Sequence, residues 1–228
     1  MLVGSSSAEQ EASPLPPAPF ADWVKPRLDA RSLVVDVGCG LGHDTMALAA
    51  SGMETIGFDV ARTAIARAQA LAATMPAPRP TFRRLDLADT RATLGQGTRL
   101  ACRPVPKTVL ARLTLDVLPG EAYENFWRFV RLCTAAGGML FLESRTQPGA
   151  ALPGTDPAVW RRQISLAEVD RRTSPIGGRL MARTAVSAPA SGLLTDTQRI
   201  AVAFDGPTRH SFEGAPRPPQ GTPPSRRP

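Results

Sequence analysis

Residues 34–45 read VVDVGCGLGHDT, and this stretch decides how the chain around it folds. Its first half is a short β-branched run, which is typical of a buried parallel strand. Its second half carries three glycines at two-residue spacing, Gly38, Gly40 and Gly42, followed by polar residues suited to the start of a helix. A tight turn needs only one glycine, so three indicate that the backbone must stay bare for another reason.

Outward from this stretch, short apolar runs alternate with helical patterns. We expect strands at 32–38, 53–59 and 80–86, a fourth strand with its exit loop within 107–119, and a fifth at 139–144. Helices are expected at 43–52, 61–75 and 121–138, with glycines closing the first and the last of them. This alternation predicts a parallel sheet covered by helices on both faces.

The pattern changes after residue 150. A helix is expected at 158–173, and two strands at 178–188 and 197–204 follow with no helix between them. Their short connection contains proline and glycine, so the two strands form an antiparallel hairpin. The expected fold class is α/β: a Rossmann-like, doubly wound, seven-stranded sheet that is mostly parallel and has an antiparallel C-terminal hairpin.

Length and composition suit one globular domain. The chain has 228 residues, of which 43% are hydrophobic and 21% charged. Residues 1–19 and 206–228 are rich in proline and small residues and lack periodicity, so we expect a disordered arm and a disordered tail around a domain at 20–205. The apolar runs are too short to span a bilayer and no secretory signal is evident, which predicts a cytoplasmic protein.

The net charge of +7 is unevenly distributed. Residues 161–228 hold 11 basic and 5 acidic side chains, whereas residues 1–160 hold 16 and 15. A basic tail can bind nucleic acid or an anionic surface, and an ordinary solvated tail is the alternative. No RNA-binding module is evident, so no specific nucleic-acid partner is expected.

Metal chemistry is not expected. The cysteines Cys39, Cys102 and Cys133 have no C-x-x-C spacing, and His43 and His210 are the only histidines. These side chains are too few and too scattered for a zinc site or a disulfide framework.

The glycine loop is compatible with two kinds of ligand. In open α/β sheets ligands bind beyond the carboxyl ends of the strands, where the helix start offers free N–H donors. A dinucleotide site would read G-x-G-x-x-G, but here Gly42 comes one position early and His43 stands in the place of the third glycine. A nucleoside that carries an amino acid suits the loop better, because Asp36 favours an ammonium group. A glycine-rich turn without any ligand is the third possibility.

Two further acidic residues follow strands. Asp59 ends the strand at 53–59, where its two oxygens match the two hydroxyls of a ribose, although it can also cap the next helix. Asp86 ends the next strand, where its carboxylate can accept from an adenine amino group while the Leu87 N–H faces a ring nitrogen. Asp89, three residues later, is the alternative for this role.

With these residues in view, VVDVGCGLGHDT, TIGFD and RRLDLAD together resemble the class I S-adenosylmethionine-dependent methyltransferases over residues 31–205. The resemblance implies S-adenosyl-L-methionine as cofactor and a sheet of seven strands. It implies that the loop Gly38, Cys39, Gly40 and Gly42 lies against the methionine and ribose of the cofactor. It further implies that Asp36 holds this loop and the methionine ammonium.

For the nucleoside half, the resemblance implies three contacts. Asp59 would bind the ribose hydroxyls, Val60 would pack on the adenine face, and Asp86 with the Leu87 amide would bind the adenine edge. Together with the glycine loop, these complete the expected cofactor-binding set.

A narrower similarity concerns residues 109–146, which look like a bacterial subgroup of small methyltransferases, some linked to surface-glycan genes. Their fourth strand tends to read Ala-Arg-Phe-x-x-His, and an Arg follows the Glu of the fifth strand. Arg112, Glu143 and Arg145 match this pattern. Asp116 stands where the subgroup usually has His, and His43 stands where it usually has Arg.

The catalytic candidates are Asp116, Arg112 and His43. Because the sulfonium is already an activated methyl donor, the protein must place a nucleophile in line and can add a general base. Asp116 can instead be a turn residue, His43 a helix N-terminal residue, and Arg112 a partner of an anionic acceptor or of Glu143. The acceptor site is expected in residues 20–30, 113–122 and 145–178.

The expected function is methyl transfer from S-adenosylmethionine to a small-molecule or glycan acceptor. The alternatives are a non-catalytic S-adenosylmethionine-binding protein that acts through a partner, and a dinucleotide-dependent oxidoreductase. The sequence points to no particular acceptor and no oligomeric state.

Overall fold

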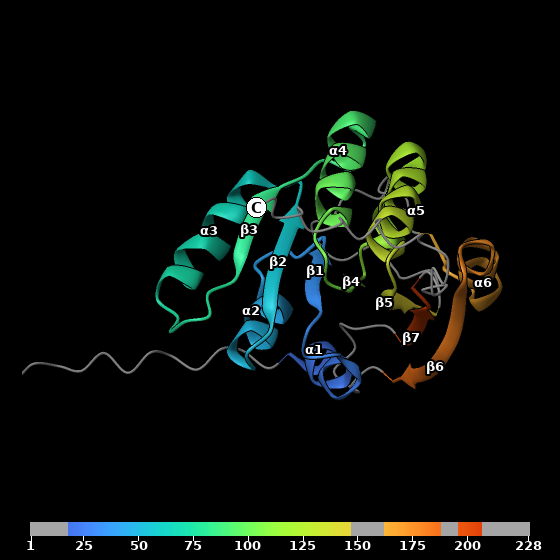
Figure 1. Cartoon of the computed structure of the whole chain (residues 1–228), viewed down its shortest axis with the longest axis horizontal. Coiled ribbons are helices and arrows are strands. Elements are labelled where there is room, and N and C mark those ends of the chain that lie inside the picture. The colour runs from blue at the N-terminus through green and yellow to red at the C-terminus, as the bar shows by residue number, and fades with distance from the viewer. Residues whose placement is uncertain (1–17, 147–161, 188–195, 207–228) are drawn as a thin grey trace, which may run out of the picture.

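A seven-stranded sheet runs through the part of the chain that the computed structural model describes, residues 18–146, 162–187 and 196–206 (Figure 1). Its strand order is β3-β2-β1-β4-β5-β7-β6. The strands are β1 (Leu33–Val37), β2 (Glu54–Asp59), β3 (Thr81–Arg84), β4 (Lys107–Arg112), β5 (Gly138–Arg145), β6 (Gly178–Val186) and β7 (Thr197–Phe204). Strands β1 to β5 are parallel, and β7 is antiparallel to both β5 and β6. The predicted fold class is confirmed.

Helices cover both faces of this sheet (Figure 1). They are α1 (Pro19–Val24), α2 (His43–Ala50), α3 (Arg62–Ala73), α4 (Thr90–Ala101), α5 (Gly120–Thr134) and α6 (Leu166–Thr173), with short 3-10 turns η1 (Lys25–Arg27), η2 (Leu115–Val117) and η3 (Ser174–Ile176). One core cluster joins α4, α5 and α6 to the sheet, while two others join α1, α2 and α3 to it. The sheet is therefore the middle of three layers.

Strand β1 shows how the layers are specified. Its residues are all buried, yet they alternate in direction, as the two-residue period of a strand requires. Val35 and Val37 belong to the cluster that contains α5, whereas Val34 belongs to the cluster that contains α1 and α2. Asp36 shares the face of Val34, so its carboxyl lies under the start of α2, where it accepts a hydrogen bond from the Thr45 hydroxyl at 2.6 Å.

Helix α4 is absent from the elements expected from the sequence, because its glycines obscure it. Gly95 and Gly97 weaken its intrinsic helical tendency. The structure shows why Gly97 is there, since a Cβ at this position would lie 2.8 Å from Leu132 Cδ1 of α5. Tertiary packing against α5 therefore stabilises a helix that its own sequence favours only weakly.

Helix α6 begins later than expected. The predicted start at 158 lies outside the described residues, and the segment 162–165 is not helical. The helix starts after Ser165, whose hydroxyl accepts a hydrogen bond from the Glu168 N–H at 3.1 Å. Ile164 before this cap and Val169 after it belong to one core cluster, as in a hydrophobic staple. The S-x-x-E signature of this cap is a local signal that the expected start at 158 overlooks.

The predicted disordered ends and the hairpin connection fall largely on residues 1–17, 188–195 and 207–228, which lie outside the described residues. Within residues 18–146, 162–187 and 196–206, no helix has the length and apolar character needed to cross a membrane.

Candidate active site

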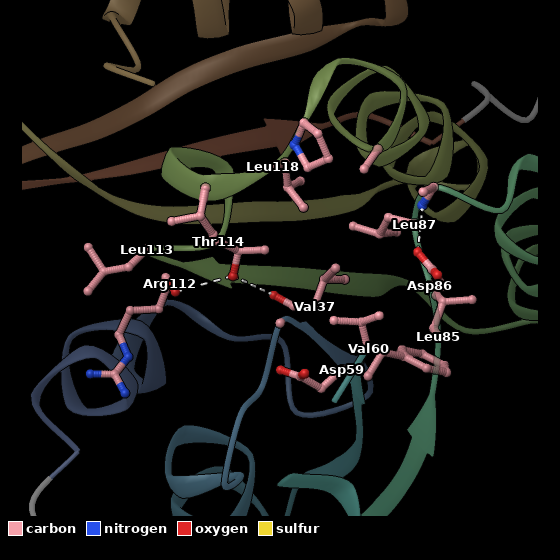
Figure 2. Close-up of a pocket in the computed structure, with 16 residues that line it drawn as sticks. Val37, Asp59, Val60, Leu85, Asp86, Leu87, Arg112, Leu113, Thr114 and Leu118 are labelled. Atoms are coloured by element: carbon pink, nitrogen blue, oxygen red, sulfur yellow. Dashed lines mark hydrogen bonds between the residues drawn. The ribbon is translucent and has the colours of Figure 1, made fainter. Parts of the chain in front are cut away.

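A cavity of about 440 Å³ opens at the carboxyl ends of β1, β2, β3 and β4 (Figure 2). It is lined by residues 37–38, 58–60, 85–88, 112–114, 117–119 and 122. Its volume falls in the range of about 300–1,000 Å³ that is common for small-molecule sites. It also lies on the side of the sheet where open α/β folds bind their ligands.

The three glycines of the loop are required for different reasons. All have positive φ, of +75° at Gly38, +54° at Gly40 and +81° at Gly42. A Cβ at Gly38 would lie 2.2 Å from Thr114 Oγ1, and one at Gly42 would lie 2.4 Å from Phe82 Cζ. Around Gly40, no heavy atom of the described chain other than those of its chain neighbours lies within 4 Å of such a Cβ. Gly38 and Gly42 thus permit packing within the protein, while Gly40 leaves open space above the backbone.

Asp59 fixes the shape of this loop. One carboxylate oxygen accepts the Gly40 N–H and the other accepts the Ala61 N–H, both at 2.8 Å. Each oxygen keeps a second lone pair, so the carboxylate can still accept two ligand hydroxyls. The helix-capping alternative does not hold in its simple form, because α3 has Ala61 at its N-cap.

Away from the glycine loop, the cavity is lined by residues that follow β2 and β3. Val60 is 53% exposed although it is apolar, and its side chain lines the cavity. Asp86 and Leu87 line it as well, and Asp86 accepts the Ala88 N–H at 2.9 Å. Asp89 lies outside the lining and caps α4 by accepting the Ala92 N–H. Of the two acidic residues left open by the sequence, Asp86 is the one at the cavity.

Asp36 and Cys39 are not among the residues that line the cavity. Asp36 is 4% exposed. Burial, together with the neighbouring Asp44 carboxylate, raises its pKa to about 7, although the Thr45 hydroxyl and Arg112 act in the opposite direction. Burial also raises the pKa of the Cys39 thiol. A thiol with a raised pKa stays in its neutral form, which is a poor nucleophile.

Arg112 does not pair with Glu143, and that interpretation of the sequence is wrong. The two residues are register neighbours on β4 and β5, but Glu143 is also the register neighbour of Arg199 on β7 and pairs with it at 2.5 Å. The Nε of Arg112 instead lies 2.6 Å from Oδ2 of Asp44, in the first turn of α2. The pairing follows from tertiary proximity between β4 and α2.

Comparisons with known proteins agree with this geometry. A family model described as a methyltransferase domain matches residues 34–102, which include the glycine loop, Asp59 and Asp86. The chain has the class I methyltransferase fold. No curated protein matches it.

Solved structures of methyltransferases share the fold at low sequence identity. Magnesium protoporphyrin IX methyltransferase from Synechocystis PCC 6803, solved with bound S-adenosylhomocysteine, is 20% identical with a TM-score of 0.60, over 82% of this chain and 81% of that one. A methyltransferase from Anabaena variabilis is 15% identical with a TM-score of 0.62, over 81% of each chain. The glycopeptide N-methyltransferase MtfA is 15% identical with a TM-score of 0.57, over 82% and 89%.

Within this methyltransferase fold, only one of the three catalytic candidates lies at the cavity. Arg112 lines the cavity, whereas Asp116 and His43 do not. Asp116 is 1% exposed, and its carboxylate accepts the Arg145 N–H at 3.2 Å while its carbonyl accepts the Arg162 N–H at 2.7 Å. Asp116 therefore holds η2 against the end of β5. His43 is the first residue of α2.

Sequence reasoning assigned no function to the β4–α5 side of the cavity beyond placing it in the acceptor region. Leu113 has a φ of +57°, a conformation that is uncommon for a residue with a side chain. Thr114 Oγ1 lies 3.0 Å from the Val37 carbonyl and 3.2 Å from that of Arg112 (Figure 2). Val117 is 44% exposed. None of these residues carries a motif, so only the backbone path reveals them.

Proposed function

We propose that the chain is an S-adenosylmethionine-dependent methyltransferase that acts on a small-molecule or glycan acceptor. The observation that carries the proposal is the position of Asp59, which holds Gly40 and also lines the cavity. Two similar structures, those of the magnesium protoporphyrin IX enzyme and of MtfA, were solved with S-adenosylhomocysteine and S-adenosylmethionine, which supports the same cofactor here.

The cavity residues fit this cofactor along its length. The free lone pairs of Asp59 suit the ribose hydroxyls, and the exposed apolar side chain of Val60 suits an adenine face. Asp86 and the Leu87 amide offer an acceptor and a donor for the adenine edge. The open space above Gly40 allows a ligand to lie directly against the backbone.

The bound cofactor supplies a methyl group on a sulfonium, which is electrophilic without help from the protein. The chain's part is to position the acceptor in line and to exclude water, and such placement can lower a barrier by about 7–11 kcal/mol. Among the described lining residues, the charged side chains are Asp59, Asp86 and Arg112. Asp59 and Asp86 belong to the nucleoside end of the cavity. We therefore propose that the chain promotes the reaction by positioning the acceptor, and we give no residue the role of general base.

The acceptor would enter beside the β4–α5 segment. Leu113, Val117 and Leu118 give that wall an apolar surface. This surface suits a compact organic acceptor. The similar proteins are named for magnesium protoporphyrin IX and for a glycopeptide, which supports a small-molecule or glycan-bearing acceptor for this chain as well.

Isothermal titration of the full chain with S-adenosylhomocysteine and with NADH tests the proposal. We expect binding of the first and none of the second. Asp59→Ala should weaken S-adenosylhomocysteine at least about 10- to 100-fold, since hydrogen bonds to a charged group are lost. The matched control is Asp89→Ala, which removes a helix-capping carboxylate outside the cavity and should leave the affinity unchanged.

Circular dichroism must show that both variants are folded. Binding of NADH without S-adenosylhomocysteine would favour the oxidoreductase alternative and refute the proposal. Equal affinities in the Asp59 variant and the wild type would remove the ribose assignment.

A further inference from the structure

Arg112 lies at one end of the cavity, held by a buried acid. Its Nε faces Asp44 Oδ2 at 2.6 Å, and the side chain of Asp44 is only 6% exposed. The other oxygen of Asp44 accepts the Ala21 N–H of α1 at 3.2 Å. Because both oxygens of Asp44 are engaged, one by α1 and one by β4, the guanidinium is fixed relative to the rest of the site.

Most of the hydrogen-bonding capacity of Arg112 is unused. A guanidinium has five N–H groups, and those on the two Nη atoms meet no acceptor among the described residues. The side chain is 39% exposed, and Arg112 is among the residues that line the cavity. A planar pair of N–H donors in this state is suited to bind a carboxylate through two parallel hydrogen bonds.

The position of Arg112 along the cavity indicates which carboxylate it would meet. Figure 2 shows Arg112 at the end remote from Asp86 and Leu87, with Asp59 between them. If the adenine lies at Asp86 and the ribose at Asp59, the amino-acid part of the cofactor extends toward Arg112. That part carries an ammonium and a carboxylate on one carbon, so it needs acidic and basic partners side by side.

The charges around Arg112 match this requirement. Asp44 lies 2.6 Å from the Nε of Arg112, and the Asp36 carboxyl lies under the start of the same helix α2, where it accepts the Thr45 hydroxyl at 2.6 Å. Arg112 is the only basic side chain among the described residues that line the cavity. Arg112 is therefore the lining side chain whose charge suits the carboxylate.

We propose that Arg112 binds the α-carboxylate of the cofactor's amino-acid end, and that Asp44 is the positioning residue that holds the guanidinium there and connects it to α1. This inference rests on the proposed function. It gives Arg112 a binding role in place of a catalytic one, and it assigns a role to Asp44, which no motif had singled out.

The test compares two ligands that differ only at the amino-acid end. S-adenosylhomocysteine carries the carboxylate, whereas 5′-methylthioadenosine keeps the thioether nucleoside and lacks the amino acid. Both are titrated into the full-length wild type, Arg112→Gln and Asp44→Asn. The control is Arg103→Gln. This substitution removes the ion pair between Arg103 and Glu54, whose 2.7 Å length is similar to that of the Arg112–Asp44 pair and whose residues do not line the cavity.

We expect Arg112→Gln to weaken S-adenosylhomocysteine about 10- to 100-fold and to leave 5′-methylthioadenosine unchanged, because one charged contact is lost. Asp44→Asn should weaken S-adenosylhomocysteine relative to 5′-methylthioadenosine by a smaller factor, because the guanidinium remains but is no longer held. Arg112→Lys should bind S-adenosylhomocysteine more tightly than Arg112→Gln does. Arg103→Gln should leave the affinities for both ligands unchanged.

Two results would overturn the inference. Equal weakening of both ligands by Arg112→Gln would show a merely structural role. An unchanged affinity for S-adenosylhomocysteine would show that the guanidinium serves another partner, such as an anionic acceptor. If the wild type binds neither ligand, the proposed function itself fails, and this result is distinct from the other two.

Discussion

Gly40→Ala separates the cost of backbone strain from the loss of ligand space. Gly40 has a φ of +54°, and no heavy atom of the described chain lies within 4 Å of the position that a Cβ would take. An alanine there strains the backbone and yet meets nothing in the described part of the protein. If the cofactor lies against this part of the loop, the added methyl group occupies space that the ligand needs.

The expected magnitudes follow from these two effects. An alanine in the left-handed region costs about 1–2 kcal/mol of folding free energy. In a domain of this size, that lowers the Tm by about 2–8 °C. Overlap with the ligand adds a penalty of about 1–3 kcal/mol to binding, which corresponds to about a 5- to 150-fold loss of affinity.

Gly177→Ala is the matched control. Gly177 has a φ of +80°, and a Cβ there would likewise meet no heavy atom of the described residues within 4 Å apart from its chain neighbours, but Gly177 follows η3 and is not part of the loop at 38–42. Thermal unfolding followed by circular dichroism should show similar losses of Tm in both variants. Isothermal titration with S-adenosylhomocysteine should show weaker binding only for Gly40→Ala. Wild-type affinity in Gly40→Ala, or equal weakening in both variants, would show that the ligand does not lie against Gly40.

Substitutions at three further positions test the buried acid, the glycine loop and the start of α6. Burial raises the pKa of Asp36 to about 7, so between about pH 4 and 7 the folded state binds a proton that the unfolded chain has released. The free energy of unfolding of the wild type should therefore fall by about 2–3 kcal/mol more than that of Asp36→Asn from pH 5 to pH 8, as measured by urea unfolding; parallel pH dependences would contradict this. Gly38→Ala combines a φ of +75° with a 2.2 Å approach to Thr114 Oγ1, so it should lose about 2–5 kcal/mol in the same assay, and a wild-type value would disprove the clash. Ser165→Ala removes the cap on the Glu168 N–H and should cost about 1 kcal/mol, with Ser165→Asn largely restoring it; equal losses in both would show that the cap is not the cause.

Local patterns were sufficient for the parts of the fold that are specified locally. The buried run of β1 and the glycine that follows α2 are signals carried by adjacent residues. Helix α4 was not predictable in this way, because Gly97 is favourable only where α5 packs against it. Its stability is a property of the pair of helices and not of the segment.

In the candidate site, too, some residues could be predicted from local sequence, whereas other contacts depend on tertiary packing. Asp59 and Asp86 were predictable as cavity-lining residues because each lies at or just beyond the end of a strand, and all parallel strands end at one edge of the sheet; Val60 came only from the family resemblance. The partner of Arg112 was not, because strand register alone pointed to Glu143. The choice of Asp44 depends on how α2 sits over β4, which is a matter of tertiary packing.

The backbone conformation of the residue that follows β4 could not be predicted from the sequence either. Nothing in the residue types announces that Leu113 takes a φ of +57° and lines the cavity. A non-glycine residue in this region costs energy that the rest of the fold must offset, and such residues gather at functional sites.

A crystal structure of the full chain with S-adenosylhomocysteine would show whether this cavity is the cofactor site. The measurement is the distance from the ribose hydroxyl oxygens to the carboxylate oxygens of Asp59. We predict two hydrogen bonds there, with the ligand against the Gly40 backbone and the adenine beside Val60. A ligand bound elsewhere, or a ribose turned away from Asp59, would contradict the assignment of this cavity as the methyl-donor site.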